Sequence, residues 1–404
     1  MMHRRSILCR LVLLCPFLLV FHHQHCTTTA TRIVDLSQPW EKDRLYNRNK
    51  AYCNIQSSMH PKIIQGWVIV QDGRIVAEGH GYDHDENDLF RSYSTTKNFA
   101  TMLIGKMVEL QLVYINETLG DIFNNTSDWE GVSQATEKQT VTLEELLTMT
   151  SGLVSVTDEA IQDQETLQQV LQYMEYQSNQ RGKFNYLGSN NILSRIIYRR
   201  SGKTPLPFAQ HNLIFDKLGI PELWIQWGTF GGVEGSAYGL NTTPRTLAKL
   251  GQLYLQNGLA AEGDQLISSD WIQASTTDQL ADDTESVQPL FLGYGYQWYV
   301  DRTVRDDMFV PLPQLTGAYA GQGALGQQIV VIPDTDTVIA IMSDDATYVY
   351  SYAFFATILQ NLDKLGRDVD EPLKCDDFSL WSFGIRGSLG VMSAGWKVLI
   401  NCLF

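Results

Sequence analysis

Strand signals stand near the two ends of this sequence, and helical signals fill the space between them. Residues 66–71 and 74–78 form two runs rich in β-branched residues, joined by Asp72-Gly73, the dipeptide most typical of a tight hairpin turn. Strand signals return at residues 294–300, 328–332 and 337–342. A chain with this order is expected to form one sheet that closes late, around a segment inserted between its strands.

The inserted segment, from about residue 106 to 289, has mainly helical periodicity. Thr142-Leu-Glu-Glu145 is a capping box, and Thr243-Pro244 is a typical helix start. Apolar stripes at helical spacing follow each of them, and a last stripe runs from Tyr350 to Leu362. We predict an α/β (α+β) fold in one domain over residues 36–365, with its sheet portion at about 36–105 and 290–365 and a tail at 366–404.

The first 26 residues have the pattern of a secretory signal peptide. Arg4 and Arg5 precede a short apolar run that contains Arg10 and Pro16 and ends in a polar stretch. Those two interruptions argue against a permanent membrane span. The alternative of an uncleaved signal anchor remains open. We expect a secreted protein, or one in the lumen of the secretory pathway, with no stable membrane span after cleavage.

Two further features fit secretion. Acceptor sequences for N-glycosylation begin at Asn116, Asn124, Asn125 and Asn241. Beyond the leader, the cysteines Cys26, Cys53, Cys375 and Cys402 lack the spacing of a zinc site. In an oxidising compartment one bridge from the N-terminal region to the tail is plausible, for instance Cys53 with Cys375, and the sequence leaves the pairing open.

The balance of charge excludes one class of partner. The 404-residue chain has a net charge of −15, and loss of Arg4, Arg5 and Arg10 with the leader would take it to −18. A protein this acidic, with no basic stripe, is a poor candidate for binding nucleic acid. Its 44% of hydrophobic residues is enough for a substantial core, so we expect a globular protein.

The chemistry of the chain concentrates in Ser94-Thr-Thr-Lys97, the one place where a lysine follows a serine at the third position. An apolar stripe begins at Phe99, so the pair should share one face in the first turn of a buried helix. A neutral lysine amine can take the serine proton, and burial and the helix N-terminus both favour the neutral form. Because the motif is short, a solvated helix terminus is its non-catalytic interpretation.

Several further segments occur in a consistent order along the chain: Leu146-Leu-Thr-Met-Thr-Ser-Gly-Leu153, Phe184-Asn-Tyr186, residues 242–255, and Gly323-Ala-Leu-Gly-Gln327 through Pro333. With the hairpin and the Ser94 motif, over about residues 50–365, they resemble the serine β-lactamase and penicillin-binding protein superfamily. The closest branch is that of class C β-lactamases, related esterases and 6-aminohexanoate-dimer hydrolases. The resemblance implies a β-lactamase/transpeptidase-like fold, in which an antiparallel sheet is flanked by helices and carries a large inserted helical region. It also implies a serine hydrolase that needs no cofactor and no metal.

The resemblance implies roles for single residues. Ser94 would be the acylated nucleophile, Lys97 its proton partner, and Tyr186 the tyrosine that shuttles a proton to the leaving group. The family commonly has an asparagine two residues after that tyrosine, whereas this chain has Gly188. Asn190 is the candidate replacement.

The third motif of the family is altered. In place of a basic residue or histidine, a hydroxyl residue and a glycine, this chain has Ala318-Tyr319-Ala320. The resemblance implies that the backbone N–H of Gly321 joins that of Ser94 in the oxyanion hole, and Gln322 is a candidate substrate contact. The missing cation would hold a substrate carboxylate. We therefore expect hydrolysis of a small-molecule ester or neutral amide through an acyl-enzyme, and turnover of β-lactams stays open.

Two other functions remain as alternatives. A secreted binding or scaffold protein that keeps the fold without activity would explain the altered third motif and Gly188. A metallohydrolase would rest on His80 and His84 with their acidic neighbours, whose spacing matches no established ligand pattern.

Overall fold

The computed structural model describes residues 31–155, 166–186, 191–280, 293–301 and 315–365. The described residues all belong to one compact unit. The expected signal peptide at residues 1–26, the tail at 366–404 and Asn190 lie outside the described residues, so these expectations stay predictions.

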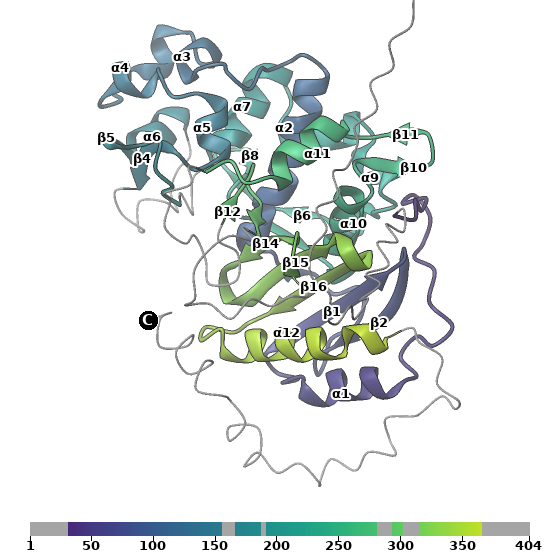
Figure 1. The fold of residues 1–404 in the computed structure, drawn as a ribbon. Helices are drawn as coiled ribbons and strands as arrows, with labels where there is room; N and C mark the ends of the chain where they lie inside the picture. The colour runs from purple at the N-terminus through teal and green to yellow at the C-terminus, as the bar shows by residue number, and fades with distance from the viewer. Residues whose placement is uncertain (1–30, 156–165, 187–190, 281–292, 302–314, 366–404) are drawn as a thin grey trace, which may run out of the picture. The chain divides into compact units, whose positions relative to one another are not determined.

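The centre of the fold is a seven-stranded sheet with the order β12-β13-β14-β15-β16-β1-β2, in which every neighbouring pair is antiparallel (Figure 1). Its strands are β1 (Ile64–Gln71), β2 (Arg74–His80), β12 (Gly293–Tyr294), β13 (Tyr299–Val300), β14 (Tyr319–Gly323), β15 (Gln327–Ile332) and β16 (Thr337–Ser343). In the pair of β1 with β16, Trp67 lies opposite Ile341. The expectation that strands from both ends of the chain share one antiparallel sheet is confirmed.

The hairpin between β1 and β2 forms because its turn residues accept left-handed backbone angles. Asp72 has φ of 47° and Gly73 has φ of 71°. A two-residue turn with positive φ at both positions matches the right-handed twist of the strands on either side. On these strands Val68, Ile69 and Ala77 are fully buried, which shows that both faces of the sheet are covered.

Helices cover both faces of this sheet. Helices α1 (Lys50–Ser58) and α12 (Val349–Asn361) pack against each other on one face, and α10 (Pro244–Leu255) packs on β1, β15 and β16 from the other (Figure 1). Thr243 caps α10 by accepting a hydrogen bond from the N–H of Thr246, and Pro244 occupies its first position, as the sequence predicts. Gly251 allows α10 to approach closely, because a Cβ there would lie 2.5 Å from Val338 Cγ1.

Helix α2 (Thr96–Glu109), the buried helix that carries Lys97, leads into the inserted segment, to which α10 also belongs. The other helices of this segment are α3 (Leu119–Ile122), α4 (Ala135–Lys138), α5 (Leu143–Leu147), α6 (Leu167–Gln172), α7 (Ile192–Ser201), α8 (Pro205–His211), α9 (Ile214–Lys217) and α11 (Ser269–Thr276). The capping box of α5 is present, with Thr142 Oγ1 accepting from Glu145 N–H and the Glu145 carboxylate accepting from Thr142 N–H.

Helices make up most of the regular structure described between residues 106 and 289, as expected, and short strands that the sequence did not predict also lie there. They are β4 (Ser151–Ser155), β5 (Met174–Arg181), β6 (Gln226–Trp227), β7 (Thr229–Phe230), β8 (Val233–Glu234), β9 (Leu240–Thr242), β10 (Leu259–Ala261) and β11 (Asp264–Gln265), and β3 (Phe90–Arg91), just before the segment, pairs with β9. The sequence of β5, Met-Glu-Tyr-Gln-Ser-Asn-Gln-Arg, is polar and low in β propensity. Its strand conformation comes from pairing with β4, which is tertiary context rather than local preference.

Within the described part of the chain, no helix combines the length and apolarity that a membrane crossing needs. The architecture is that of an α+β protein of the β-lactamase/transpeptidase-like fold, as the resemblance implied.

Candidate active site

Ser94 lies in a short 3-10 turn, Tyr93–Thr95, that runs directly into α2. Tyr93 has φ of 45°, a left-handed conformation that is uncommon for a residue with a side chain. The turn is fixed from two sides, because Ser92 N–H donates to Leu240 O at 2.8 Å and Thr95 Oγ1 donates to Ser92 O at 2.8 Å. This places the half-buried Ser94 side chain at the wall of a cavity.

Lys97 lies one helical turn further on, and its side chain is almost fully buried. Its Nζ is 3.1 Å from Ser94 Oγ and 3.0 Å from Ala237 O. Burial lowers the pKa of Lys97, because the charged ammonium loses its hydration, while the phenol of Tyr186 acts in the opposite direction. A lowered pKa increases the fraction of neutral amine, the form that can accept the Ser94 proton.

Tyr186 reaches the same place from a segment that follows β5. The N–H of Asn185 donates to Met149 O at 2.8 Å, which ties this segment to the chain after α5. The Tyr186 ring centroid is 5.1 Å from Lys97 Nζ, and the phenol acts on the pKa of Lys97. The structure therefore brings Tyr186 together with Ser94 and Lys97, which lie in a distant part of the sequence, as the resemblance implied.

Three buried amides that the sequence did not single out hold these segments in place. Asn98 Nδ2 donates to Gln297 O at 2.9 Å, and Gln297 Nε2 donates to Leu147 O at 2.8 Å. Asn191 Oδ1 accepts from the N–H of Ala237, the residue whose carbonyl contacts Lys97. An amide residue has no sequence signature for such a role, so only the tertiary contacts could have revealed these residues.

Strand β14 borders the nucleophile and carries the altered third motif. Ala318 and Tyr319 are buried, and a Cβ on Gly321 would lie 2.2 Å from Asn98 Oδ1, so glycine there allows α2 to approach the strand. The N–H of Asp301, the residue after β13, donates to Ala318 O at 2.9 Å, so the backbone polar groups of Ala318 are directed toward β13. Successive residues of a strand direct their N–H groups to opposite edges. Gly321, opposite Ile329, therefore directs its N–H toward β15, whereas that of Gln322 is directed to the other edge, past the end of β13.

A cavity of about 340 Å³ opens beside Ser94. Its lining consists of Ser94, Tyr186, Tyr299, Gln322, Gly323, Ala324, Gly326, Gln327, Gln328, Thr347, Tyr348 and Tyr352. These are hydroxyl, amide and small residues, and among the residues that the structure describes the lining includes no carboxylate, guanidinium, ammonium or imidazole group. The described part of the lining is therefore polar but uncharged.

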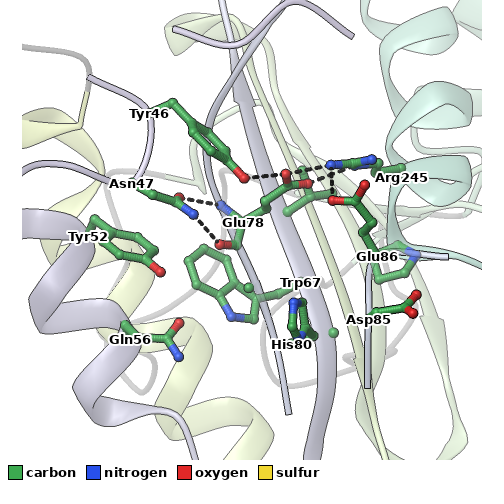
Figure 2. A pocket seen from close by; sticks show the side chains of 14 residues that line it. Tyr46, Asn47, Tyr52, Gln56, Trp67, Glu78, His80, Asp85, Glu86 and Arg245 are labelled. Carbon is green, nitrogen blue, oxygen red and sulfur yellow. Dashed lines mark hydrogen bonds and ion pairs between the residues drawn. The ribbon is translucent and has the colours of Figure 1, made fainter. Parts of the chain in front are cut away.

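A second pocket, of about 180 Å³, lies beside the edge strand β2 and has the opposite character. Figure 2 shows Arg245 between the carboxylates of Glu78 and Glu86, with Tyr46 donating to Glu78 from the other side. Asn47 pairs through its side-chain amide with the backbone N–H and C=O of Glu78, which covers part of the free strand edge (Figure 2). These charged groups satisfy one another, which is typical of a structural cluster.

The two histidines of the metal hypothesis, His80 and His84, have different surroundings. His80 lines the Glu78 pocket, while His84 Nδ1 is 3.1 Å from Asp88 Oδ2 and its ring packs edge-on against Phe90. In the part of the chain that the structure describes, no group of three or more histidine, cysteine or acidic side chains is arranged to hold a metal ion. The geometry gives the metallohydrolase alternative no support.

The residues tied to secretion are placed only in part. Asn116, Asn124 and Asn125 are exposed and Asn241 is half-buried in β9, so at least three acceptor side chains are accessible. Cys53 in α1 is disulfide-bonded, and the other cysteines of the chain lie outside the described residues. The pairing of Cys53 with Cys375 stays a prediction.

The fold and the site together define a protein of the β-lactamase/transpeptidase class. The Beta-lactamase family profile matches residues 65–351, which is more than half of the chain, and the protein belongs to the Beta-lactamase family of serine hydrolases. A search of the curated proteins finds no match.

Solved structures with the same fold come from several enzymes. EstCE1, a hydrolase with promiscuous acyltransferase activity, superposes with a TM-score of 0.61 at 15% identity, over 77% of this chain and 98% of its own. A class C β-lactamase from Rhodobacter sphaeroides gives 0.56 at 16% identity, over 78% and 99%. A Bacillus anthracis protein assigned as a 6-aminohexanoate-dimer hydrolase gives 0.58 at 19% identity, over 76% and 81%. At these identities the likeness shows the fold alone.

Proposed function

We propose that this protein is a secreted serine hydrolase that cleaves a neutral ester or amide through an acyl-enzyme on Ser94. The observation that carries the proposal is the buried amine of Lys97, 3.1 Å from Ser94 Oγ at the wall of the cavity. A buried amine with a lowered pKa, in contact with a serine hydroxyl, is the arrangement that activates a nucleophile.

In the proposed reaction Ser94 Oγ bonds to the substrate carbonyl carbon, and its proton passes to neutral Lys97. The tetrahedral oxyanion accepts hydrogen bonds from backbone N–H groups. When the bond to the leaving group breaks, that group takes the proton of Tyr186, and the Lys97 ammonium returns a proton to Tyr186. Water then attacks the acyl-enzyme with the same groups acting in reverse, and this step releases the acid and restores Ser94.

The second oxyanion donor in this proposal is the N–H of Gln322, beside that of Ser94. The resemblance pointed to Gly321, but the strand register directs the Gly321 N–H toward β15, where the ladder uses it. The Gln322 N–H is directed to the edge past the end of β13, and Gln322 lines the cavity together with Ser94. A backbone donor is suited to this role whatever its side chain.

The uncharged cavity supports a neutral substrate. Recognition of a carboxylate usually relies on arginine or lysine, and the described lining residues contain neither. The lining also offers the apolar ring surface of four tyrosines, each with one polar hydroxyl: Tyr186, Tyr299, Tyr348 and Tyr352. An acyl group with apolar character fits this lining better than an anionic one.

A fluorophosphonate probe tests the proposal, because it reacts with activated serines. Wild-type protein is expected to be labelled rapidly, and Ser94→Ala is expected to be unlabelled. Ser92→Ala is the matched control, since the Ser92 hydroxyl is buried two residues earlier and forms no side-chain hydrogen bond in the structure. Wild type that labels no better than Ser94→Ala would reject the hydrolase and favour a binding protein that keeps the fold.

The secreted location rests on the leader-like residues 1–26, the disulfide of Cys53 and the accessible asparagines of the acceptor sequences. Expression of the full chain in animal cells should give protein in the medium whose mass falls on treatment with an N-glycosidase. Protein that stays in the cytosol with an intact N-terminus would contradict this location.

A further inference from the structure

Tyr299 is a second tyrosine at the nucleophile, and no sequence motif points to it. It begins β13, lies opposite Ala320 of β14, and lines the cavity with Ser94 although its side chain is largely buried. Its ring stacks on that of Tyr186, with centroids 6.2 Å apart and planes at 28°. The phenol of Tyr186 is also among the groups that raise the pKa of Tyr299, as expected for neighbouring hydroxyls. Tyr186 thus has both Lys97 and Tyr299 beside it.

The surroundings of Tyr299 favour it as the donor in a hydrogen bond to Tyr186. Burial, together with the neighbouring phenols of Tyr186, Tyr294 and Tyr352, raises the pKa of Tyr299 well above its usual value. A raised pKa keeps the proton on the Tyr299 hydroxyl, which can then donate it in a hydrogen bond. A phenol oxygen accepts two hydrogen bonds and donates one. If Tyr186 Oη accepts from Lys97 and from Tyr299, its own proton is left for a third group.

We propose that Tyr299 is a positioning residue that donates to Tyr186 Oη and thereby aims the Tyr186 proton at the leaving group. This inference rests on the proposed hydrolase function. As the carbon–oxygen or carbon–nitrogen bond breaks, the proton moves from Tyr186 to the leaving atom, and Tyr186 is re-protonated by the Lys97 ammonium formed when Ser94 attacked. The Tyr299 hydroxyl stabilises the negative oxygen of Tyr186 between these two transfers and gives up no proton itself.

The position of Tyr299 also explains how the altered third motif is tolerated. Ala318, just before β14, and Ala320 in β14 stand where the family has a basic residue or histidine and a glycine, so the motif itself supplies no cation beside Tyr186. The neighbouring strand β13 provides a neutral hydroxyl donor at the position opposite Ala320. A phenol can orient Tyr186 without introducing the positive charge that would favour an anionic substrate.

The test compares Tyr299→Phe with wild type on two esters of the same acid, p-nitrophenyl butyrate and ethyl butyrate. Nitrophenolate leaves without help from an acid, whereas ethoxide needs a proton as it leaves. We expect Tyr299→Phe to lower kcat for the ethyl ester by about 10- to 100-fold and that for the nitrophenyl ester by less than about 3-fold, with KM unchanged within about 2-fold. In Tyr299→Phe the alkaline limb of the kcat/KM profile, where Tyr186 loses its proton, should shift to higher pH. The reason is that Tyr299 no longer stabilises the negative oxygen of Tyr186.

Two controls separate this role from folding. Tyr294→Phe removes another buried hydroxyl, from a ring that packs edge-on against Tyr299 with centroids 5.0 Å apart, and should leave both rates near those of wild type. Fluorophosphonate labelling of Ser94 in Tyr299→Phe should stay within about 3-fold of wild type, because fluoride leaves without a proton. The inference about Tyr299 is overturned if Tyr299→Phe loses kcat equally on the two esters, or if wild type and Tyr299→Phe depend on the leaving group in the same way. In either case labelling of Ser94 would still support the proposed hydrolase. Absence of labelling in wild type rejects both.

Discussion

Lys97 and Arg245 are both largely buried cations, and their surroundings differ. Arg245 donates to both carboxylate oxygens of Glu78, at 2.8 and 2.6 Å, and to Glu86 at 2.9 Å (Figure 2). Burial alone would lower the pKa of Arg245, but these carboxylates more than offset it and the pKa is raised. Lys97 is contacted by uncharged groups, the hydroxyls of Ser94 and Tyr186 and the carbonyl of Ala237, and its pKa is lowered by burial.

The difference shows how one chain uses buried charge for two purposes. A cation with carboxylate partners stays ionised and contributes to stability, because its desolvation is compensated. A cation among neutral dipoles is pushed toward its uncharged form, which makes it a base. The first arrangement should therefore affect unfolding and the second should affect chemistry, and substitutions can separate the two.

The largest expected effect is on activity. Lys97→Ala removes the proposed base and should lower esterase turnover at least ~100-fold while the melting temperature stays the same or rises, since a costly buried amine is removed. Steady-state hydrolysis of p-nitrophenyl butyrate and calorimetry measure the two quantities. Lys106→Ala, the same change near the end of the same helix, is the control and should keep full activity. An unchanged rate in Lys97→Ala would exclude Lys97 as the base.

The next effect is on stability. Arg245→Met leaves Glu78 buried without its main partner and should lower the free energy of unfolding by about 3 kcal/mol, with Ser94 labelling unchanged. Urea unfolding measures the loss. Arg74→Met, which breaks the exposed pair with Glu41, is the control and should change the free energy of unfolding far less, because both side chains are exposed to solvent. Similar losses for the two variants would show that the Glu78 pocket does not stabilise the fold as described.

A substitution at β14 should affect both quantities to an intermediate extent. Gly321→Ala places a Cβ about where Asn98 Oδ1 lies, so the strand or α2 must shift, at a cost of about 2 kcal/mol and with about 10-fold slower labelling of Ser94. Gly228→Ala is the control, because the nearest atom to its Cβ would be at an ordinary 3.4 Å. Labelling as fast as wild type in Gly321→Ala would show that the close approach of α2 and β14 is not needed at the site.

The smallest effect is a change in pH dependence at a third buried cation. Lys249 donates to Leu36 O and Gln38 O, and burial lowers its pKa to about 8, opposed by the charge of Asp35. Between about pH 8 and the ordinary lysine pKa of about 10.4, the unfolded chain binds the extra proton, so the free energy of unfolding should rise with pH. The penalty for burying the ammonium is fully present below about pH 8.

Lys249→Met should abolish the part of that rise that comes from Lys249, measured by urea unfolding at about pH 7.5 and about pH 10. The exposed Lys62→Met is the control and should keep the wild-type slope. A slope in Lys249→Met equal to that of wild type would mean that Lys249 is not the group responsible.

Much of the fold could be predicted because its signals are local. The Asp72-Gly73 turn, the capping box at Thr142 and the Pro244 helix start each depend on a few adjacent residues, and all three form as expected. The strand β5 could not be predicted, since its polar sequence becomes a strand only against β4. Helix α1, which carries no strong apolar stripe, was likewise not anticipated.

The candidate site divides in the same way. Ser94 and Lys97 are one helical turn apart, so their contact follows from helix geometry alone. The sequence by itself thus determined that a serine and a lysine would meet at a helix start. It also determined that strands from both ends of the chain would form one sheet.

Only the tertiary structure decided what that pair can do. The carbonyl of Ala237, 140 residues from Lys97, the hydroxyl of Tyr299 and the edge to which Gln322 directs its N–H all come from distant segments. Burial and strand register arise when such segments pack together. The protonation of Lys97 depends on burial, and the choice of Gln322 as the proposed oxyanion donor depends on strand register. Neither could be derived from the order of residues near Ser94.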